Sequence, residues 1–179
     1  MKKLLIGLGI LFLSTGVANA IDAIVTLDYV HFRGHMGDLF SGSIISLNAV
    51  SGTVSITISP NAGEILHCDI QTISSGMGSI AVYESPTVTF VGSSVISMQN
   101  NNRRAGKTLS TVVSSNVTIT ALGTIIRAQT QTPVGVYTYG SSMGSRYELI
   151  LDPLKKYYIA YLPNGVTQSV SIILNMYKD

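Results

Sequence analysis

The sequence predicts an all-β protein that folds as a single antiparallel β-sandwich with a jelly-roll-like arrangement of about ten strands. After the N-terminus, apolar and polar residues alternate with a period of two in most segments, as they do in strands that bury one face. β-Branched residues are abundant in these segments, and short turn sequences separate them at fairly regular intervals. No window of eleven or more residues has apolar residues at helical spacing, so we expect little or no helix.

The segment 53–59 shows the alternation clearly. Val54, Ile56 and Ile58 form an apolar face, and the residues between them form a face of hydroxyl groups. The same pattern predicts strands at 24–30, 66–70, 80–83, 88–90, 95–98, 117–121, 124–128, 147–151, 157–162 and 170–177.

Turn sequences connect these predicted strands. Residues 59–63 (SPNAG) indicate a tight connection, and residues 162–165 (LPNG) indicate a hairpin between two strong strands. Gly34, Gly37 and Gly42 loosen the early segment of the chain, and none of the predicted strands includes them. Two connections are longer: residues 100–106 are polar and basic, and residues 130–145 are rich in Gly, Ser and Tyr.

Residues 1–20 have the three-part plan of a secretory signal peptide. Two lysines near the start precede an apolar run at 4–13, and the small-residue site Ala18-Asn19-Ala20 follows. As a helix, residues 4–17 would span about 21 Å, whereas the hydrocarbon core of a bilayer is about 30 Å thick, which disfavours a membrane anchor. We therefore expect cleavage after Ala20 and one β-sandwich domain comprising residues 21–179.

The charge balance of the expected mature chain disfavours two classes of partner. Without Lys2 and Lys3, nine of the eleven basic residues remain, against nine acidic residues. A neutral chain with no basic face gives no electrostatic basis for binding nucleic acid or, after signal cleavage, a membrane. The only cysteine, Cys68, excludes an intramolecular disulfide, and its alternating position predicts a buried, inert thiol.

His31, His35 and Asp38 are the only candidates for a metal site. Zinc sites use histidines with such gaps, but they need three or four rigidly held ligands, and Gly34 lies within this group. We expect a hydrophilic loop or strand edge here, with no metal. No glycine-rich segment leads from a predicted strand into a helix, so no phosphate-binding loop and no cofactor are predicted.

Glu84 and Glu148 are the two carboxylates embedded in apolar predicted strands. A glycosidase would need such a pair about 5 to 10 Å apart in a cleft, but no Trp accompanies them as a sugar platform. No serine lies in a nucleophile-elbow pattern either, so no enzyme activity is predicted. The structural alternative is that each glutamate pairs with an arginine such as Arg103, Arg104 or Arg127, and the pair we expect is Arg103 with Glu148.

The two longer connections are the candidate interaction sites. The first carries Arg103 and Arg104, and the second carries Tyr137 and Tyr139, whose side chains offer large contact areas with few rotatable bonds. Predicted strand edges without blunting residues, in a chain with 46% hydrophobic residues, favour a homo-oligomer.

Several short motifs follow one another in order across residues 65–179. They are Tyr83-Glu84-Ser85-Pro86, Asn100-Asn101-Asn102-Arg103-Arg104, Leu122-Gly123-Thr124, Tyr147-Glu148-Leu149-Ile150-Leu151, Lys156-Tyr157-Tyr158 and Leu174-Asn175-Met176-Tyr177. This order resembles that of a family of small tailed-phage and prophage virion structural proteins. In that family a YE-x-P strand, an N-x-N-R loop, a GT strand, an E-L-I-L strand and a final strand ending in Tyr occur in this order. The resemblance implies a β-sandwich at the virion surface that decorates or cements a capsid by binding a capsid or other virion protein, without enzyme activity.

The signal-like residues 1–20 leave two functional interpretations open. In a virion protein, which assembles in the cytoplasm, they would form an assembly arm. The alternative is an exported bacterial surface protein, such as an adhesin, a pilus-like subunit or a carbohydrate-binding module, that is secreted, periplasmic or at the cell surface. The absence of Trp and of a recognisable subunit-exchange strand disfavours this alternative.

Overall fold

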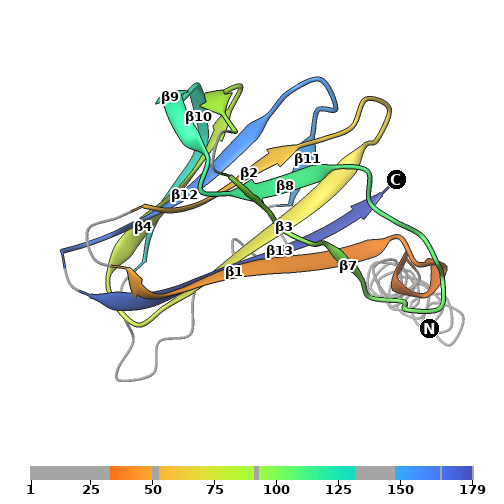
Figure 1. Ribbon diagram of the computed structural model, residues 1–179, viewed down its shortest axis with the longest axis horizontal. Coiled ribbons are helices and arrows are strands. Elements are labelled where there is room, and N and C mark those ends of the chain that lie inside the picture. Colours follow the sequence, from red (N-terminus) through yellow and green to blue (C-terminus); the bar gives the residue numbers. More distant parts are fainter. Residues whose placement is uncertain (1–32, 50–52, 91–92, 132–147, 166, 179) are drawn as a thin grey trace, which may run out of the picture.

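The computed structural model describes residues 33–49, 53–90, 93–131, 148–165 and 167–178. These residues form an almost entirely β structure in which two antiparallel sheets pack face to face (Figure 1). The predicted all-β sandwich is thereby confirmed. The predicted strand at 24–30 lies outside the described residues.

The described residues contain thirteen strands, several of them very short. In chain order they are β1 (Leu39–Ala49), β2 (Val54–Ser59), β3 (Leu66–Ser74), β4 (Gly78–Glu84), β5 (Thr87–Thr89), β6 (Ser94–Val95), β7 (Gln99–Asn100), β8 (Val112–Ser115), β9 (Thr118–Ala121), β10 (Thr124–Gln131), β11 (Leu149–Leu151), β12 (Tyr157–Pro163) and β13 (Gln168–Lys178).

The strand order is that of a jelly roll. One sheet has the order β11-β3-β13-β1-β7, the other has the order β10-β4-β12-β2-β8-β6, and β5 and β9 form a small separate pair. Within the two sheets β1 pairs with β13, β2 with β12, β3 with β11 and β4 with β10. The first strand thus pairs with the last, the second with the next to last, and so on inward. This order results when one long antiparallel ribbon is wrapped into two sheets. The jelly-roll-like arrangement expected from the sequence is therefore present.

The core lies between the sheets and is built from the alternating residues of the long strands. In β3, buried and more exposed residues alternate. Leu66, Cys68 and Ile70 are buried, and the residues between them are partly exposed. Cys68 has only 1% of its surface exposed, as its position in the pattern predicted. Burial of each large apolar side chain of this kind contributes about 1.5–3 kcal/mol, so the alternation fixes which face of each strand points inward.

The long strand β1 lies in the glycine-containing segment and was not among the predicted strands. The structure explains Gly42 by close packing. A Cβ atom at this position would lie 2.4 Å from the Sδ atom of Met98, which crosses over the strand. β1 nevertheless pairs with β13 in register from Leu39 opposite Tyr177 to Ser46 opposite Val170.

The hairpin predicted at residues 162–165 is wrong. A turn does occur there, with Gly165 at a φ of 76°, but it connects β12 of the six-stranded sheet to β13 of the five-stranded sheet. The backbone N–H of Asn164 donates to the carbonyl of Met77, in the connection between β3 and β4, at 2.9 Å. The turn therefore carries the chain from one layer to the other.

Candidate functional site

Residues 93–115, which we call the crossing segment, close one open side of the sandwich. The segment leaves the six-stranded sheet at β6, reaches the five-stranded sheet at β7 and returns at β8. β7 extends one sheet beyond β1, and β8 extends the other beyond β2. Ile96, Met98 and Leu109 pack against the core, so the predicted strand at 95–98 is in fact a crossing between two sheets.

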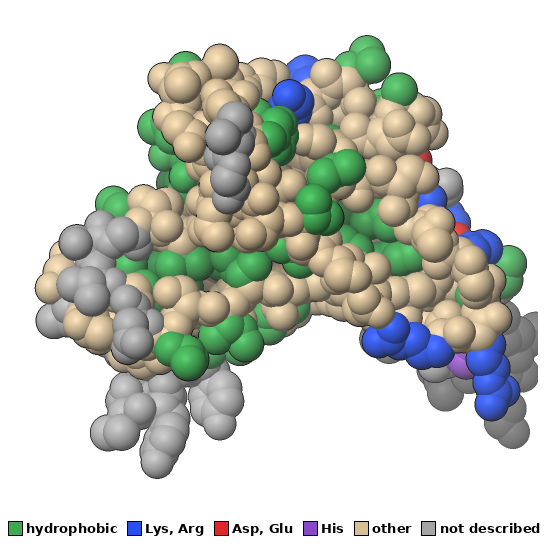
Figure 2. Space-filling model, in the orientation of Figure 1, with side chains coloured by type: hydrophobic (Ala, Val, Ile, Leu, Met, Phe, Trp, Pro, Cys, Tyr) green, Lys and Arg blue, Asp and Glu red, His purple; other side chains and the backbone are tan. Residues whose placement is uncertain are grey.

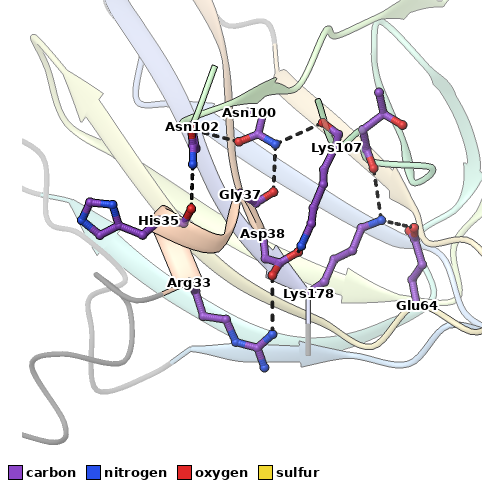
Figure 3. Close-up of polar contacts among 10 residues, drawn as sticks. Arg33, His35, Gly37, Asp38, Glu64, Asn100, Asn102, Lys107 and Lys178 are labelled. Atoms are coloured by element: carbon purple, nitrogen blue, oxygen red, sulfur yellow. Dashed lines mark hydrogen bonds and ion pairs between the residues drawn. The ribbon is translucent and has the colours of Figure 1, made fainter. Parts of the chain in front are cut away.

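Two asparagines fix the loop at the tip of the crossing segment (Figure 3). Asn100 donates from Nδ2 to the carbonyl oxygens of Gly37 at 2.8 Å and Lys107 at 3.0 Å, and its Oδ1 accepts from the backbone N–H of Asn102 at 2.8 Å. Asn102 donates from Nδ2 to the carbonyl of His35 at 2.6 Å. The loop is therefore held to the short helical turn that precedes β1.

Gly37 allows this helical turn to approach the loop closely. Its φ is 76°, a left-handed conformation that favours glycine, and a Cβ atom there would lie 2.1 Å from the Cβ of Ala105. A larger residue at position 37 would separate the turn from the loop that carries the two arginines.

Asp38 supplies the main counter-charge at this end of the molecule. Its carboxylate lies 2.8 Å from Nζ of Lys107 and 3.9 Å from Nη1 of Arg33, and only 14% of its side chain is exposed (Figure 3). One carboxylate is thus shared by two cations. The sequence analysis considered Asp38 only as a candidate metal ligand. Its partner Lys107 lies 69 residues away in the chain, and no local sequence pattern indicated that the two would pair.

Glu64 joins three segments through a second ion pair. Its carboxylate lies 2.7 Å from Nζ of Lys178, and Lys178 also donates to the carbonyl of Thr108 (Figure 3). The carboxylate of Glu64 also accepts a hydrogen bond from Thr111 at 2.9 Å. Burial tends to raise the pKa of Glu64, but the hydrogen bonds from Lys178 and Thr111 outweigh it and hold the pKa below its ordinary value. The network ties the connection between β2 and β3 to the end of β13 and to the start of β8.

Arg103 and Arg104 are exposed at the tip of the loop, as the interaction hypothesis requires. Arg103 donates from its guanidinium to the side-chain oxygen of Gln99, and neither arginine pairs with a carboxylate within the described residues. Lys and Arg side chains gather at this end of the molecule in Figure 2. Tyr137 and Tyr139, the other expected interaction residues, lie outside the described residues.

The expected ion pair between Arg103 and Glu148 is wrong. Arg103 follows β7 and Glu148 precedes β11, and these strands are the opposite edges of the same sheet. Three strands separate them, which at about 4.8 Å per strand places the two edges about 19 Å apart. Glu148 instead lies 3.0 Å from Nδ1 of His67, whose ring stacks on Tyr177 with centroids 4.6 Å apart.

Glu84 pairs with a lysine and a tyrosine, which also corrects the expectation of an arginine partner. Nζ of Lys155 lies 2.9 Å from its carboxylate, and the hydroxyl of Tyr157 lies 3.4 Å away. The hydrogen bond from Lys155 to Glu84 raises the pKa of that lysine. Burial raises the pKa of Tyr157, whose hydroxyl also accepts from the backbone N–H of Asp152 at 2.8 Å.

Gly123 belongs to the same cluster as Glu84. Its φ is 80°, and a Cβ atom there would lie 2.2 Å from the carbonyl oxygen of Glu84. The YE-x-P, GT and K-Y-Y motifs therefore meet at one place in the six-stranded sheet, and their residues hold strand ends together. At these three motifs the residues lie where the backbone is closely packed.

The two glutamates do not form a shared acid–base pair. Glu84 ends β4 in the six-stranded sheet, whereas Glu148 precedes β11 in the five-stranded sheet, and each is engaged by its own neighbours. His31, one of the three metal candidates, is outside the described residues. Within the described residues no group of three or more His, Cys, Asp and Glu side chains is placed to hold a metal ion.

A groove of about 550 Å³ runs between the outgoing and returning parts of the crossing segment. Val95, with 74% of its surface exposed, and Val112, with 46%, contribute to its apolar lining. Arg103 and Lys107 line it at the tip of the loop. The groove thus combines an apolar floor with a basic end.

Comparison with known proteins does not place the chain in a family. No protein-family model matches it, and neither does any curated protein or solved structure. Among the described residues, no helix has the length and apolar character needed to cross a membrane.

Proposed function

We propose that the protein is a non-enzymatic structural component of a phage-type virion surface, of the capsid decoration type. The observation that carries this proposal is the jelly-roll order of the two sheets, an architecture that recurs in viral capsid proteins. The same fold also hosts lectins and enzymes, so the fold by itself leaves several functions open. The order of motifs from Tyr83 to Tyr177 favours the virion protein among them.

The placement of the motifs supports a structural role. Glu84 and Glu148 hold neighbouring strands through Lys155 and His67, which is what carboxylates in a scaffold do. A general acid would instead face a cleft with its pKa tuned for proton transfer. The functional chemistry of such a protein would then be its surface complementarity to other copies and to a capsid.

The loop at residues 100–107 is the contact surface that we propose for the virion partner. Asn100 and Asn102 hold it in place before any partner binds, which reduces the conformational entropy lost on association. Arg103 and Arg104 are then presented to the partner without a competing carboxylate among the described residues. Self-association through exposed strand edges is part of the same proposal.

Fractionation of the producing culture tests this function. Nuclease-treated particles are banded on a density gradient, and the chain is quantified by mass spectrometry in the particle band and in the particle-free fraction. We expect a fixed number of copies per particle in the band. Recovery of the chain only in the particle-free fraction would overturn the proposal.

Binding to particles tests the loop itself. Purified chain is added to particles from which the gene has been deleted, and we expect Arg103→Glu with Arg104→Glu to weaken rebinding at least tenfold, as for loss of two charged contacts. Lys156→Glu, which reverses one exposed cation just before β12 and outside the loop, is the control and should rebind like the wild type. Equal loss in both variants would remove the specific role of the loop.

The second candidate, an exported bacterial surface protein, is favoured by one observation, the signal-like sequence of residues 1–20. The same fractionation distinguishes it. A secreted or cell-surface chain with the mass of residues 21–179 supports export, whereas intact Met1 in purified particles supports an N-terminal arm within an assembly.

A further inference from the structure

We propose that Arg103 and Arg104 bind a second copy of the chain at the edge strand β11, where Glu148 is their partner. This contact names the partner of the loop at residues 100–107, and it rests on the function proposed above for the role of that loop as a contact surface. Three observations support it: the row of the sheet that joins the two edges, the opposite charges at the ends of that row, and the exposed apolar residues beside them.

The first observation is that the loop and β11 lie at the two ends of one row of the five-stranded sheet (Figure 1). In this row Leu39 of β1 lies opposite Tyr177 of β13, which lies opposite His67 of β3. His67 in turn lies opposite Ile150 of β11. The loop continues the row beyond β1, because the backbone N–H of Asn101 donates to the carbonyl of Leu39 at 2.9 Å. A second copy placed beside the first in the plane of the sheet, with the rows aligned, therefore brings the loop of one copy against β11 of the other.

The second observation is that opposite charges lie at the two ends of this row. At the loop end, Arg103 and Arg104 are exposed, and neither pairs with a carboxylate in the described part of the chain. The carboxylate of Asp38 is only 14% exposed and is shared by Lys107 and Arg33. The loop end therefore has cations in excess.

At the β11 end the excess charge is negative. The carboxylate of Glu148 lies 3.0 Å from Nδ1 of His67, and 32% of its side chain is exposed. Asp69 lies on the same face of β3 as His67, and among the described residues neither carboxylate forms an ion pair with lysine or arginine. Burial raises the pKa of the Cys68 thiol, and the nearby charges of Asp69 and Glu148 raise it further. The arginine loop of a neighbouring copy supplies the cations that this end lacks.

The third observation is that exposed apolar side chains accompany the charges at both ends. Ile150 of β11 is 66% exposed and belongs to the row itself. Val95, at the start of the crossing segment that carries the loop, is 74% exposed. Each surface thus combines charge with apolar area, as protein interfaces do. Because the two surfaces differ, the contact is head-to-tail, and its repetition closes a ring or extends a filament.

Disulfide trapping with cysteines at the two ends of the row tests the contact on purified chain. Asn101→Cys and Ile150→Cys, made in separate chains, leave the charged residues unchanged, and the native Cys68 is only 1% exposed. The two ends are about 19 Å apart within one chain, too far for a disulfide, so a bond between these positions joins two copies. We expect a mixture of the two variants to form the mixed dimer under mild oxidation at least about fivefold faster than a mixture of Asn101→Cys with Ile45→Cys.

Ile45→Cys is the matched control, because Ile45 is 68% exposed and lies on β1 of the same sheet, away from the β11 edge. Adding Arg103→Glu and Arg104→Glu to the Asn101→Cys chain should lower the rate to that of the control, because glutamates would then face Glu148. The disulfide reports this contact alone, whether or not other strand edges associate.

Three results would overturn the proposal. Mixed dimers that form no faster than with Ile45→Cys would show that the loop does not meet β11. A rate unchanged by the reversal of both arginines would show that charge does not hold the contact. Dimers of Asn101→Cys with itself that form as fast as the mixed dimer would indicate a two-fold contact between loops instead. Each of these results is independent of the particle fractionation, so failure of this contact and absence of the chain from particles are distinguished.

Discussion

At the scale of single residues, backbone geometry explains several positions that the sequence presented only as short motifs. Gly123 is such a position, because its left-handed φ and its distance to the carbonyl of Glu84 both exclude a side chain. Gly63 has a similar φ of 90°, but a Cβ atom there would have no other atom within 4 Å. A substitution at Gly63 would therefore introduce conformational strain alone, whereas a substitution at Gly123 would introduce both strain and a steric clash.

We predict that Gly123→Ala lowers the free energy of unfolding by about 2–4 kcal/mol, because the alanine is both strained and in collision with the backbone. Gly63→Ala, the matched control, should lose only about 1 kcal/mol, the cost of a left-handed alanine. Urea denaturation of both variants measures the difference. An equal loss in the two would mean that the six-stranded sheet accommodates the extra methyl group by a shift.

Asn100 provides a second test at this scale. Asn100→Asp replaces a two-proton donor with an acceptor that faces the carbonyl oxygens of Gly37 and Lys107, so we expect a loss of about 1–3 kcal/mol in thermal or urea unfolding. Asn101→Asp, at an exposed neighbouring position, makes the same change of charge and should alter stability little. Similar losses in both variants would indicate a general charge effect in place of the two hydrogen bonds.

At the scale of elements, the network around Glu64 connects segments that are distant in the chain. The folded protein holds the pKa of Glu64 below its unfolded value, so its ion pair stabilises the fold above that unfolded value and loses this contribution as the pH falls through the folded pKa. We predict that Glu64→Gln lowers stability at neutral pH by about 1 kcal/mol, as for a partly exposed pair. The difference from wild type should shrink as the pH falls below about 4.

Urea denaturation of the two proteins across this pH range measures the effect. Thr111→Val is a useful companion variant, because it removes one hydrogen bond to Glu64 and leaves Lys178 in place. It should show a smaller pH-dependent loss than Glu64→Gln. A difference between wild type and Glu64→Gln that stays constant with pH would exclude the ion pair as its source.

The comparison of predicted and observed strands shows what local pattern can and cannot reveal. Alternation located β2, β3, β4, β12 and β13, because each has one face in the core. Alternation did not locate β1, which contains Gly42. A side chain at position 42 would collide with Met98, and this contact joins residues that are far apart in the chain. The turn at 162–165 was found, but a local turn sequence does not specify whether the next strand joins the same sheet or the opposite one.

The candidate site was predictable only in part, for the same reason. Loop composition identified Arg103 and Arg104 as exposed, and both are. Their neighbours Asp38 and Lys107 come from segments that are distant in the chain and meet through the fold alone. The pairing of Arg103 with Glu148 failed because the jelly roll places β7 and β11 at opposite edges of one sheet.

At the scale of the whole molecule, the exposed edge of the six-stranded sheet bears on assembly. β10 is the edge strand of that sheet and pairs with β4 alone within the described residues. Leu122, Ile125 and Ile126 are exposed large hydrophobic residues on and next to this strand. A strand of eight residues at the end of the strand order, with exposed apolar side chains on it and beside it, favours contact with another chain.

We therefore predict that the protein self-associates at micromolar concentrations through β10, and that Ile125→Lys shifts it toward monomer. Ile125 is 53% exposed, so a lysine there can reach solvent in the monomer, but in a paired edge it would bury a charge or repel its symmetry mate. Sedimentation velocity over a concentration series measures the change. Leu154→Lys, in the turn before β12, adds the same charge at a more exposed position away from β10 and should leave the association unchanged. A wild-type chain that remains monomeric throughout the series would contradict the prediction. If both lysine variants were equally monomeric, net charge and not the β10 edge would control assembly.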